Sequence, residues 1–409
     1  MHYKTLLSSV FFALLINIAS AQSKLKPGTW RGALKTSSGN ELPFNFEVKD
    51  VAGKQQLAII NGSERFKVTD IRQKGDSVFI HMPLFNSEFK LKYEGAALKG
   101  KWIKHLGDKD ASMDFTAIYG ETRRFLSTEK PAFNITGRWS AIFGEAAHLD
   151  TTVGEFKQVG TKLTGTFLTT TGDYRFLEGT VAGNKIYLST FDGGHAFLFT
   201  ADVKDNKTIE NGKYYAGYSS VDPWTAIRNE NAKLPDAYSL TYLKPGYKKI
   251  DFSFPGIDGK KVSLNDARFK NKVVIVQILG SWCPNCMDET SYLVNYYKKY
   301  HPKGVEIIGL AYERTTDFAK SVPTLKQLKT RFNIGYPLLI TGYTPNRGDP
   351  QKSLPMLADF KGFPTTIIID KKGDVRKIHT GFSGPGTGKY YTEFTQEFEK
   401  LTDDLLAEK

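Results

Sequence analysis

The chain has 409 residues, a formal net charge of +13 and only two cysteines. Its basic residues are spread along the whole length, which argues against a nucleic-acid-binding protein because such proteins usually cluster their charge on one stripe. With one possible cysteine pair, the fold cannot depend on a set of disulfides. The length predicts roughly two or three domains, each large enough to bury its own hydrophobic core.

The first 21 residues are typical of an export signal. Met1–Lys4 carries positive charge, an apolar run follows from Leu6 to Ile18, and Ala19–Ala21 has the small residues that a signal peptidase recognises. A short buried N-terminal helix is the alternative. The run is too short to cross a bilayer, and no later stretch reaches the roughly 20 apolar residues of a membrane helix. We therefore expect a mature protein that begins near Gln22, is soluble in the periplasm and has no transmembrane segment.

The first 230 residues contain an internal repeat, with matching segments offset by 108 to 112 positions. In order, the matches are Gly28–Trp30 with Gly137–Trp139, Arg65–Phe66 with Arg175–Phe176, Val78–Ile80 with Ile186–Leu188, Gly100–Trp102 with Gly212–Tyr214, and Phe115–Glu121 with Trp224–Glu230. Five ordered matches indicate a duplication, because chance similarity would not keep the same order and offset. We place one copy at residues 22–125 and the other at 126–230.

Each copy is predicted to be all-β. Apolar and polar residues alternate in segments such as Asn45–Asp50 and Ser77–Met82, and turn residues recur every 8–12 positions. This pattern is typical of antiparallel meanders that form a sandwich or a small barrel, with about eight strands and no helix in each copy. The G-x-W opening of each copy resembles lipocalin-like barrels, although a buried tryptophan is common in any β core. Neither copy has a catalytic or metal-ligand cluster, so we expect a tandem binding or spacer module.

After a polar linker at residues 231–246, the pattern changes to alternating strands and helices, which is typical of an α/β domain. We expect strands at Lys272–Leu279, Val305–Ala311, Thr365–Asp370 and Val375–Thr380, and helices at Pro284–Tyr300, from about Pro323 to Phe332, and at Lys389–Leu406. The first of these strands is continuously apolar and is therefore predicted to be buried on both faces.

Both cysteines, Cys283 and Cys286, lie at the junction between that buried strand and the first helix. Pro284 suits the first helical position. The free backbone N–H groups and the helix dipole favour a thiolate at Cys283, which would make this sulfur nucleophilic. Cys286, one turn further on, can attack the mixed disulfide that Cys283 forms with a substrate.

Other uses of the pair are open from the residues alone. A structural zinc site needs four ligands, and the seven histidines offer no second pair at suitable spacing. A copper-carrying site would need a downstream histidine, for which His379 is the candidate. A purely structural bridge would close a ring too short to stabilise the fold strongly. Thiol–disulfide exchange is the use that a C-x-x-C pair in this setting favours, and we expect no metal and no cofactor.

The sequence WCPNC at this junction resembles the W-C-x-x-C motif of thioredoxins, and the segment Phe252–Asp266 is similar to the start of TlpA/ResA-like proteins and of AhpC/TSA-related redoxins. The resemblance covers residues 247–409. It implies a thioredoxin fold with a central mixed sheet flanked by helices, a β-hairpin before this core and an insert at Glu313–Arg331. It also implies an exported enzyme that exchanges disulfides with protein substrates and receives electrons from a membrane-bound thiol–disulfide partner.

The resemblance also implies which residues contact the substrate. Trp282 matches the aromatic residue that shields the nucleophile. Phe363 and Pro364 match the loop in which a cis-proline faces the cysteines and the preceding backbone pairs with a substrate strand. We expect Trp282, Pro284, Phe363 and Pro364 to form the substrate-binding surface.

Proton transfer at the pair is expected to involve Glu289, the third candidate catalytic residue beside the two cysteines. Glu289 matches a glutamate that TlpA/ResA-like proteins use in proton handling. Gln277 replaces the buried carboxylate of thioredoxin, and because an amide cannot take up a proton, a relay to Cys286 must use Glu289 or water.

The direction of exchange is expected to be reduction, since the dipeptide between the cysteines lacks the histidine of strongly oxidising members. The alternative function is a non-catalytic binding protein, in which the β repeats bind a ligand or partner and the thioredoxin-like domain serves as a scaffold.

Overall fold

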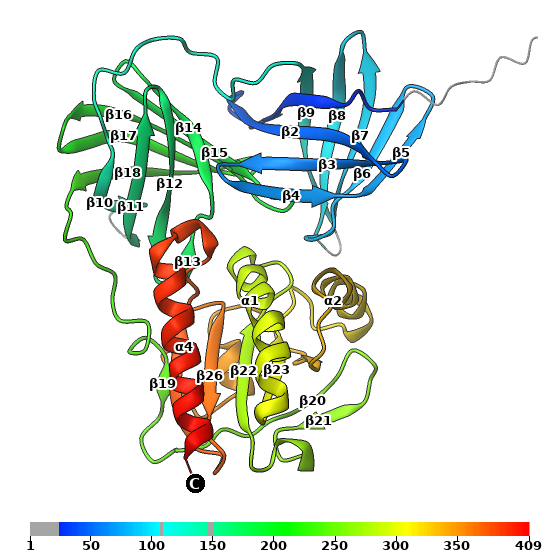
Figure 1. The fold of residues 1–409 in the computed structure, drawn as a ribbon, viewed down its shortest axis with the longest axis vertical. Helices are drawn as coiled ribbons and strands as arrows, with labels where there is room; N and C mark the ends of the chain where they lie inside the picture. Colours follow the sequence, from blue (N-terminus) through cyan, green and yellow to red (C-terminus); the bar gives the residue numbers. More distant parts are fainter. Residues whose placement is uncertain (1–23, 107–108, 146–149, 409) are drawn as a thin grey trace, which may run out of the picture.

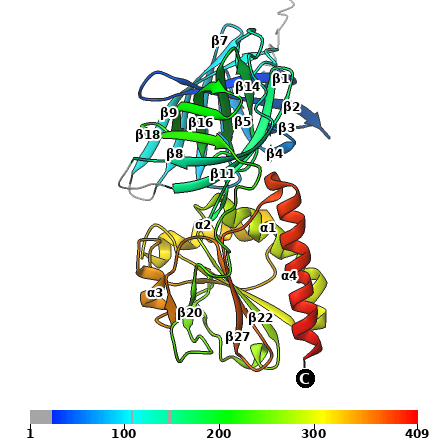
Figure 2. The ribbon, with the colours of Figure 1, turned by 90° about the vertical axis from the view of Figure 1, so that its left-hand side faces the viewer.

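The computed structural model of the chain describes residues 24–106, 109–145 and 150–408. The expected export signal at residues 1–21 lies outside the described residues. In the described part, no helix is long and apolar enough to span a membrane. Figures 1 and 2 show two β units packed side by side on top of an α/β domain, which confirms the predicted fold class.

Within the residues that the structure describes, the first β unit is a nine-stranded antiparallel sheet, one strand more than expected. Its strands are β1 (Gly28–Lys35), β2 (Glu41–Val51), β3 (Lys54–Asn61), β4 (Glu64–Val68), β5 (Asp70–Lys74), β6 (Ser77–His81), β7 (Ser87–Glu94), β8 (Ala97–His105) and β9 (Asp110–Tyr119). Their order is β4-β3-β2-β1-β9-β8-β7-β6-β5, so that β1 pairs with both β2 and β9. Burial alternates along β6, as expected for strands with one face on a core.

The second β unit also has nine strands in the described residues. They are β10 (Gly137–Phe143), β11 (Asp150–Val159), β12 (Lys162–Thr169), β13 (Gly172–Asp173), β14 (Leu177–Ala182), β15 (Lys185–Phe191), β16 (Ala196–Asp205), β17 (Thr208–Ala216) and β18 (Ser220–Arg228). Here β11 pairs with β12 as well as with β10, so the sheet closes on itself as a barrel. The short strand β13 extends from β12 beyond this ring.

The two G-x-W tryptophans occupy equivalent buried positions. Trp30 and Trp139 are 1% and 0% exposed. Each indole N–H donates to the carbonyl four residues earlier, at 2.9 Å to Lys26 and 3.0 Å to Ile135. Both side chains therefore combine a large apolar surface with a satisfied polar group.

A buried arginine between the two β units ties them together. The Arg124 guanidinium donates to the Ser189 carbonyl at 2.9 Å and to the Ile60 carbonyl, while its own carbonyl accepts from Arg31 Nε at 2.9 Å. Beside it, Phe191 from the second unit stacks on Phe44 of the first with ring centroids 4.4 Å apart. The two units therefore share apolar packing as well as hydrogen bonds.

The C-terminal domain is built on a five-stranded mixed sheet with the order β24-β23-β22-β26-β27. Its elements, with those leading into it, are β19 (Tyr242–Leu243), β20 (Ser253–Pro255), β21 (Lys261–Ser263), η1 (Ala267–Phe269), β22 (Val273–Leu279), α1 (Pro284–Tyr300), η2 (His301–Lys303), β23 (Val305–Ala311), α2 (Phe318–Phe332), β24 (Leu338–Ile340), α3 (Asp349–Ser353), β25 (Leu357–Ala358), β26 (Thr365–Ile369), β27 (Val375–Thr380), η3 (Pro385–Thr387) and α4 (Lys389–Ala407). Helices α1 and α4 pack together on one face, where Tyr296 and Phe398 have ring centroids 5.1 Å apart (Figure 2). The apolar β22 is buried along its whole length in the centre.

Some details of this domain differ from the expectation. Helix α2 begins at Phe318 instead of Pro323, because the Asp317 side chain caps it by accepting from the Lys320 N–H at 3.2 Å. Pro323 lies inside this helix. The predicted linker contains β19, which pairs with β25, and neither strand was expected.

Replacing Arg124 with alanine is expected to lower the free energy of unfolding by about 3 kcal/mol, because buried carbonyls on both β units lose their donor. Its neighbour Arg123 supplies a matched control, since it forms an exposed pair with Glu121. Urea denaturation followed by tryptophan fluorescence should show a lower midpoint for Arg124→Ala and no shift for Arg123→Ala. Equal midpoints for the two variants would contradict a stabilising role for the buried guanidinium.

Candidate active site

The two cysteines lie where β22 ends and α1 begins. Cys283 is the N-cap of α1 and Pro284 is its first residue, as the sequence predicted. The pair is joined as a disulfide, and the Cys286 N–H donates to Cys283 Sγ at 3.2 Å. Cys283 is 4% exposed and Cys286 is fully buried. The helix N-terminus therefore supplies both a backbone donor and a favourable dipole to the sulfur of Cys283.

Aromatic residues from three loops lie beside the disulfide. Trp282 and Phe363 meet edge to face with ring centroids 5.4 Å apart. The Trp282 indole N–H donates to the Tyr312 carbonyl at 2.9 Å, which fixes the ring. The Phe363–Pro364 peptide bond is cis, as the resemblance implied, and Pro364 directly precedes β26. The structure thus brings the expected substrate-contact residues to one end of the sheet.

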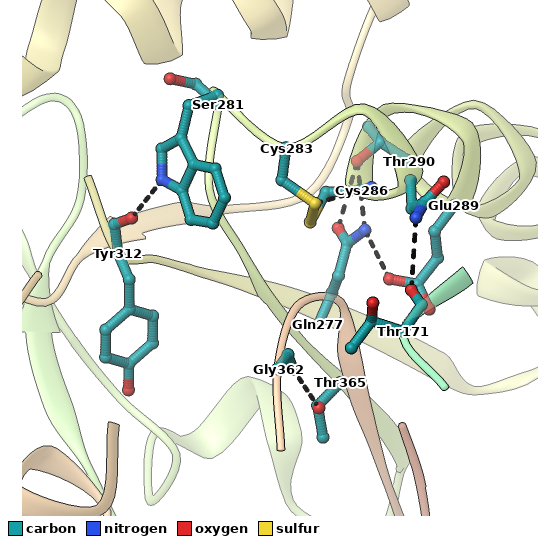
Figure 3. Close-up of a disulfide and its surroundings, with 12 residues drawn as sticks. Thr171, Gln277, Ser281, Cys283, Cys286, Glu289, Thr290, Tyr312, Gly362 and Thr365 are labelled. Carbon is teal, nitrogen blue, oxygen red and sulfur yellow. Dashed lines mark hydrogen bonds between the residues drawn. A yellow bond between two sulfur atoms is a disulfide. The ribbon is translucent and has the colours of Figure 1, made fainter. Parts of the chain in front are cut away.

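Glu289 and Gln277 are hydrogen-bonded to each other beneath the cysteines (Figure 3). Gln277 Nε2 donates to Glu289 Oε2 at 2.8 Å, and the Thr366 hydroxyl donates to Glu289 Oε1 at 2.6 Å. Glu289 is 1% exposed. This burial raises the pKa of Glu289 to about 7, although the two hydrogen bonds act in the opposite direction. A carboxyl that exchanges protons near neutral pH therefore lies one helical turn from Cys286.

Sequence reasoning missed Glu313, which supports the turn before the cysteines. Its carboxylate accepts from the Ser281 N–H at 2.9 Å and from the Ser281 hydroxyl at 2.6 Å. Burial raises the pKa of Glu313. Glu313 follows the end of β23, and because β22 and β23 are parallel neighbours, their carboxyl ends meet at the cysteine turn. A carboxylate two residues after an apolar strand was the signal that could have found it.

The copper candidate His379 belongs to the core. Its ring lies 4.9 Å from that of Tyr238 and 4.8 Å from that of Phe394, and Nδ1 lies 3.0 Å from the Gly381 carbonyl oxygen. Burial lowers the pKa of His379 to about 4. This environment therefore favours a neutral His379 ring packed among aromatic side chains.

Comparisons with known proteins agree with this geometry. Residues 244–393 match the Redoxin family. The thiol-disulfide oxidoreductase ResA of Bacillus thuringiensis subsp. konkukian is 32% identical over 133 residues, which cover 32% of this chain and 68% of that protein. ResA of Bacillus subtilis is 26% identical over 139 residues, or 34% of this chain and 69% of that protein. The chain belongs to the ResA-like thiol-disulfide oxidoreductases.

A solved structure of a thioredoxin-family thiol:disulfide interchange protein from Chlorobium tepidum TLS is 24% identical and covers 39% of this chain and 96% of that one, with a TM-score of 0.30. In this ResA-like chain the matched Redoxin segment holds both cysteines, Glu289 and the cis-proline. The β units lie outside that segment.

Replacing Glu289 with glutamine is expected to flatten the dependence of stability on pH. Because its pKa rises from 4.5 to about 7 on folding, the folded protein keeps a proton that the unfolded chain releases in this range. The contribution of this Glu289 proton to the free energy of unfolding is therefore complete below pH 4.5 and is lost as the pH rises through about 7.

Urea denaturation of the oxidised protein near pH 5 and pH 8 measures this effect. The free energy of unfolding should fall with pH by on the order of 2 kcal/mol more in the wild type than in Glu289→Gln. Burial also raises the pKa of Asp288 to about 7, but this carboxyl contributes equally to both proteins. The exposed Glu393→Gln on α4 should behave as the wild type does. An equal fall in all three proteins would show that Glu289 carries no shifted proton.

Proposed function

We propose that this chain is an exported reductase that exchanges disulfides with protein substrates through Cys283 and Cys286. The observation that carries the proposal is the Cys286 N–H bond to Cys283 Sγ at the N-terminus of α1. This arrangement favours a thiolate on Cys283 once the pair is reduced, and a thiolate is the form that attacks disulfides.

In the proposed reaction, the Cys283 thiolate attacks one sulfur of the substrate disulfide and displaces the other as a thiolate. Cys286 then loses its proton and attacks Cys283, which breaks the mixed disulfide and releases the second substrate sulfur. Two electrons pass from the cysteine pair to the substrate, and the two released thiolates take up protons. The pair ends as the disulfide seen in the structure.

Glu289 is proposed to accept the proton of Cys286, directly or through water. With its pKa raised to about 7, the carboxyl populates both protonation states near neutral pH, which suits a general base or acid. Gln277 and Thr366 orient it without competing for the proton, because neither an amide nor a hydroxyl titrates in this range.

The surface of Trp282, Pro284, Phe363 and Pro364 is proposed to contact the substrate chain beside the disulfide. The fixed rings of Trp282 and Phe363 offer apolar contacts, and the backbone before Pro364 offers pairing groups to an extended segment. After each cycle, a membrane-bound thiol–disulfide donor is proposed to reduce the Cys283–Cys286 disulfide.

The proposed location is the periplasm, supported by the signal-like composition of residues 1–21. We also infer that the two β units are a duplicated binding or spacer module, with copies at 22–125 and 126–230 and a linker at 231–246 before the thioredoxin-like domain. Their equivalent tryptophan hydrogen bonds and their meander order support a duplication.

Reduction of insulin with dithiothreitol as electron source tests the proposal. Cys283→Ser should lose at least about 99% of the rate, because the remaining Cys286 is fully buried and cannot attack a substrate disulfide. Once reduced and freed of dithiothreitol, Cys286→Ser should accumulate with oxidised insulin a covalent mixed disulfide through Cys283, visible by mass under non-reducing conditions. If Cys283→Ser remains as active as the wild type, the chain acts as a binding protein and the reductase proposal fails.

A further inference from the structure

A segment of the second β unit lies across the redox site. We call Thr170–Arg175 the strap. It consists of the two-residue turn between β12 and β13, the strand β13 itself, and the two residues that follow. Figure 1 shows β13 at the end of its sheet that faces the α/β domain, and Figure 3 shows Thr171 among the residues around the disulfide.

The tip of the strap touches the first turn of α1 and two loops near the cysteine pair. Asn285, between the cysteines, donates its amide to the Thr171 carbonyl at 3.4 Å. A Cβ at Gly362, next to Phe363, would lie 2.6 Å from Thr171 Cγ2. A Cβ at Gly381 would lie 2.7 Å from the Thr170 carbonyl oxygen. The contact is so close that neither glycine leaves room for a side chain.

The base of the strap is anchored by buried charged groups. The Asp173 carboxylate accepts from the Gly384 N–H at 2.8 Å. Arg175 donates to Asp288 on α1 at 2.5 Å and also pairs with Glu64 of the first β unit. The side chains of Arg175 and Asp288 are only 11% and 16% exposed. Removing one partner leaves a buried charge uncompensated, so this cluster holds the strap strongly.

The strap occupies the surface that a protein substrate needs. An extended chain that pairs with the backbone before Pro364 must pass over Gly362 and Asn285, where Thr171 already lies. Cys283, two residues before Asn285, is only 4% exposed. An in-line attack needs contact between two sulfurs, so a segment docked beside Cys283 limits which disulfides can reach it.

We propose that the strap Thr170–Arg175 determines which substrates the redox site accepts, because a protein disulfide reaches Cys283 only after displacing it. The inference rests on the proposed reductase function, and it assigns the second β unit a part in substrate selection. A displaced strap also breaks the Arg175 bridge, so the first β unit, through Glu64, stabilises the closed arrangement.

Two variants of the full chain weaken the strap in different ways. Arg175→Gln removes the ionic anchor, and Thr171→Gly removes the side chain that packs on Gly362. Thr161→Gly is the matched control, because Thr161 is exposed in the two-residue turn between β11 and β12 of the same unit. Tryptophan fluorescence and thermal melting identify any variant that fails to fold. Thr171→Gly keeps the charged groups that hold the strap, Asp173 and Arg175.

Access to Cys283 is measured by its alkylation rate in the fully reduced protein, with the modified peptide identified by mass spectrometry. The pH is set above the ordinary cysteine pKa of about 8.5, so that the rate reports exposure and not ionisation. Both strap variants should alkylate faster, with about a tenfold gain for Arg175→Gln if docking loses about 1.4 kcal/mol. Their insulin reduction should rise in parallel, and Thr161→Gly should match the wild type.

The strap proposal is overturned if folded Arg175→Gln and Thr171→Gly alkylate at the wild-type rate, or if faster alkylation comes with slower insulin reduction. The first result would mean that the strap does not limit access, and the second that it helps to bind substrate. Failure of the reductase function gives a different result, in which no variant reduces insulin while the strap variants still alkylate faster.

Discussion

The arrangement of this site depends on burying one carboxyl group under the cysteine pair. Glu289 is held between Gln277 on β22 and Thr366 on β26, so its position is fixed by the two central strands of the sheet. Burial would disfavour a permanent charge here, and the pKa near 7 is the result. The same group that lowers stability at alkaline pH is the one proposed to exchange a proton with Cys286.

The second constraint is that the β units and the thioredoxin-like domain share one ionic cluster. Arg175 reaches Glu64 in one β unit and Asp288 on α1, so three parts of the chain meet beside the active site. Asp288 lies two residues after Cys286, which places this cluster on the same helix turn as the chemistry. The β units are therefore anchored to the helix that begins at the cysteine pair.

Much of the thioredoxin-like domain could be predicted from the sequence because its elements are long and strongly patterned. Helix α1 and strand β23 have the bounds that periodicity and flanking prolines indicated. The start of α2 was missed because Pro323 was taken as a boundary, whereas the cap at Asp317 sets it. Strands as short as β24 and β25 show no periodicity. The strap contacts depend on docking between residues more than 100 positions apart, such as Arg175 and Asp288, which no local pattern encodes.

The central claim is that the proton on Glu289 is coupled to the redox state of the Cys283–Cys286 pair. Its most direct test is the reduction potential of the pair against pH in the wild type and in Glu289→Gln. A nearby thiolate makes the carboxyl hold its proton more tightly, so above about pH 7 reduction of the wild type should take up one more proton. In that range the reduction potential of the wild type should therefore fall by about 30 mV per pH unit more steeply than it does below about pH 7, and the potential of Glu289→Gln should show no such change of slope. Two parallel plots would contradict the coupling.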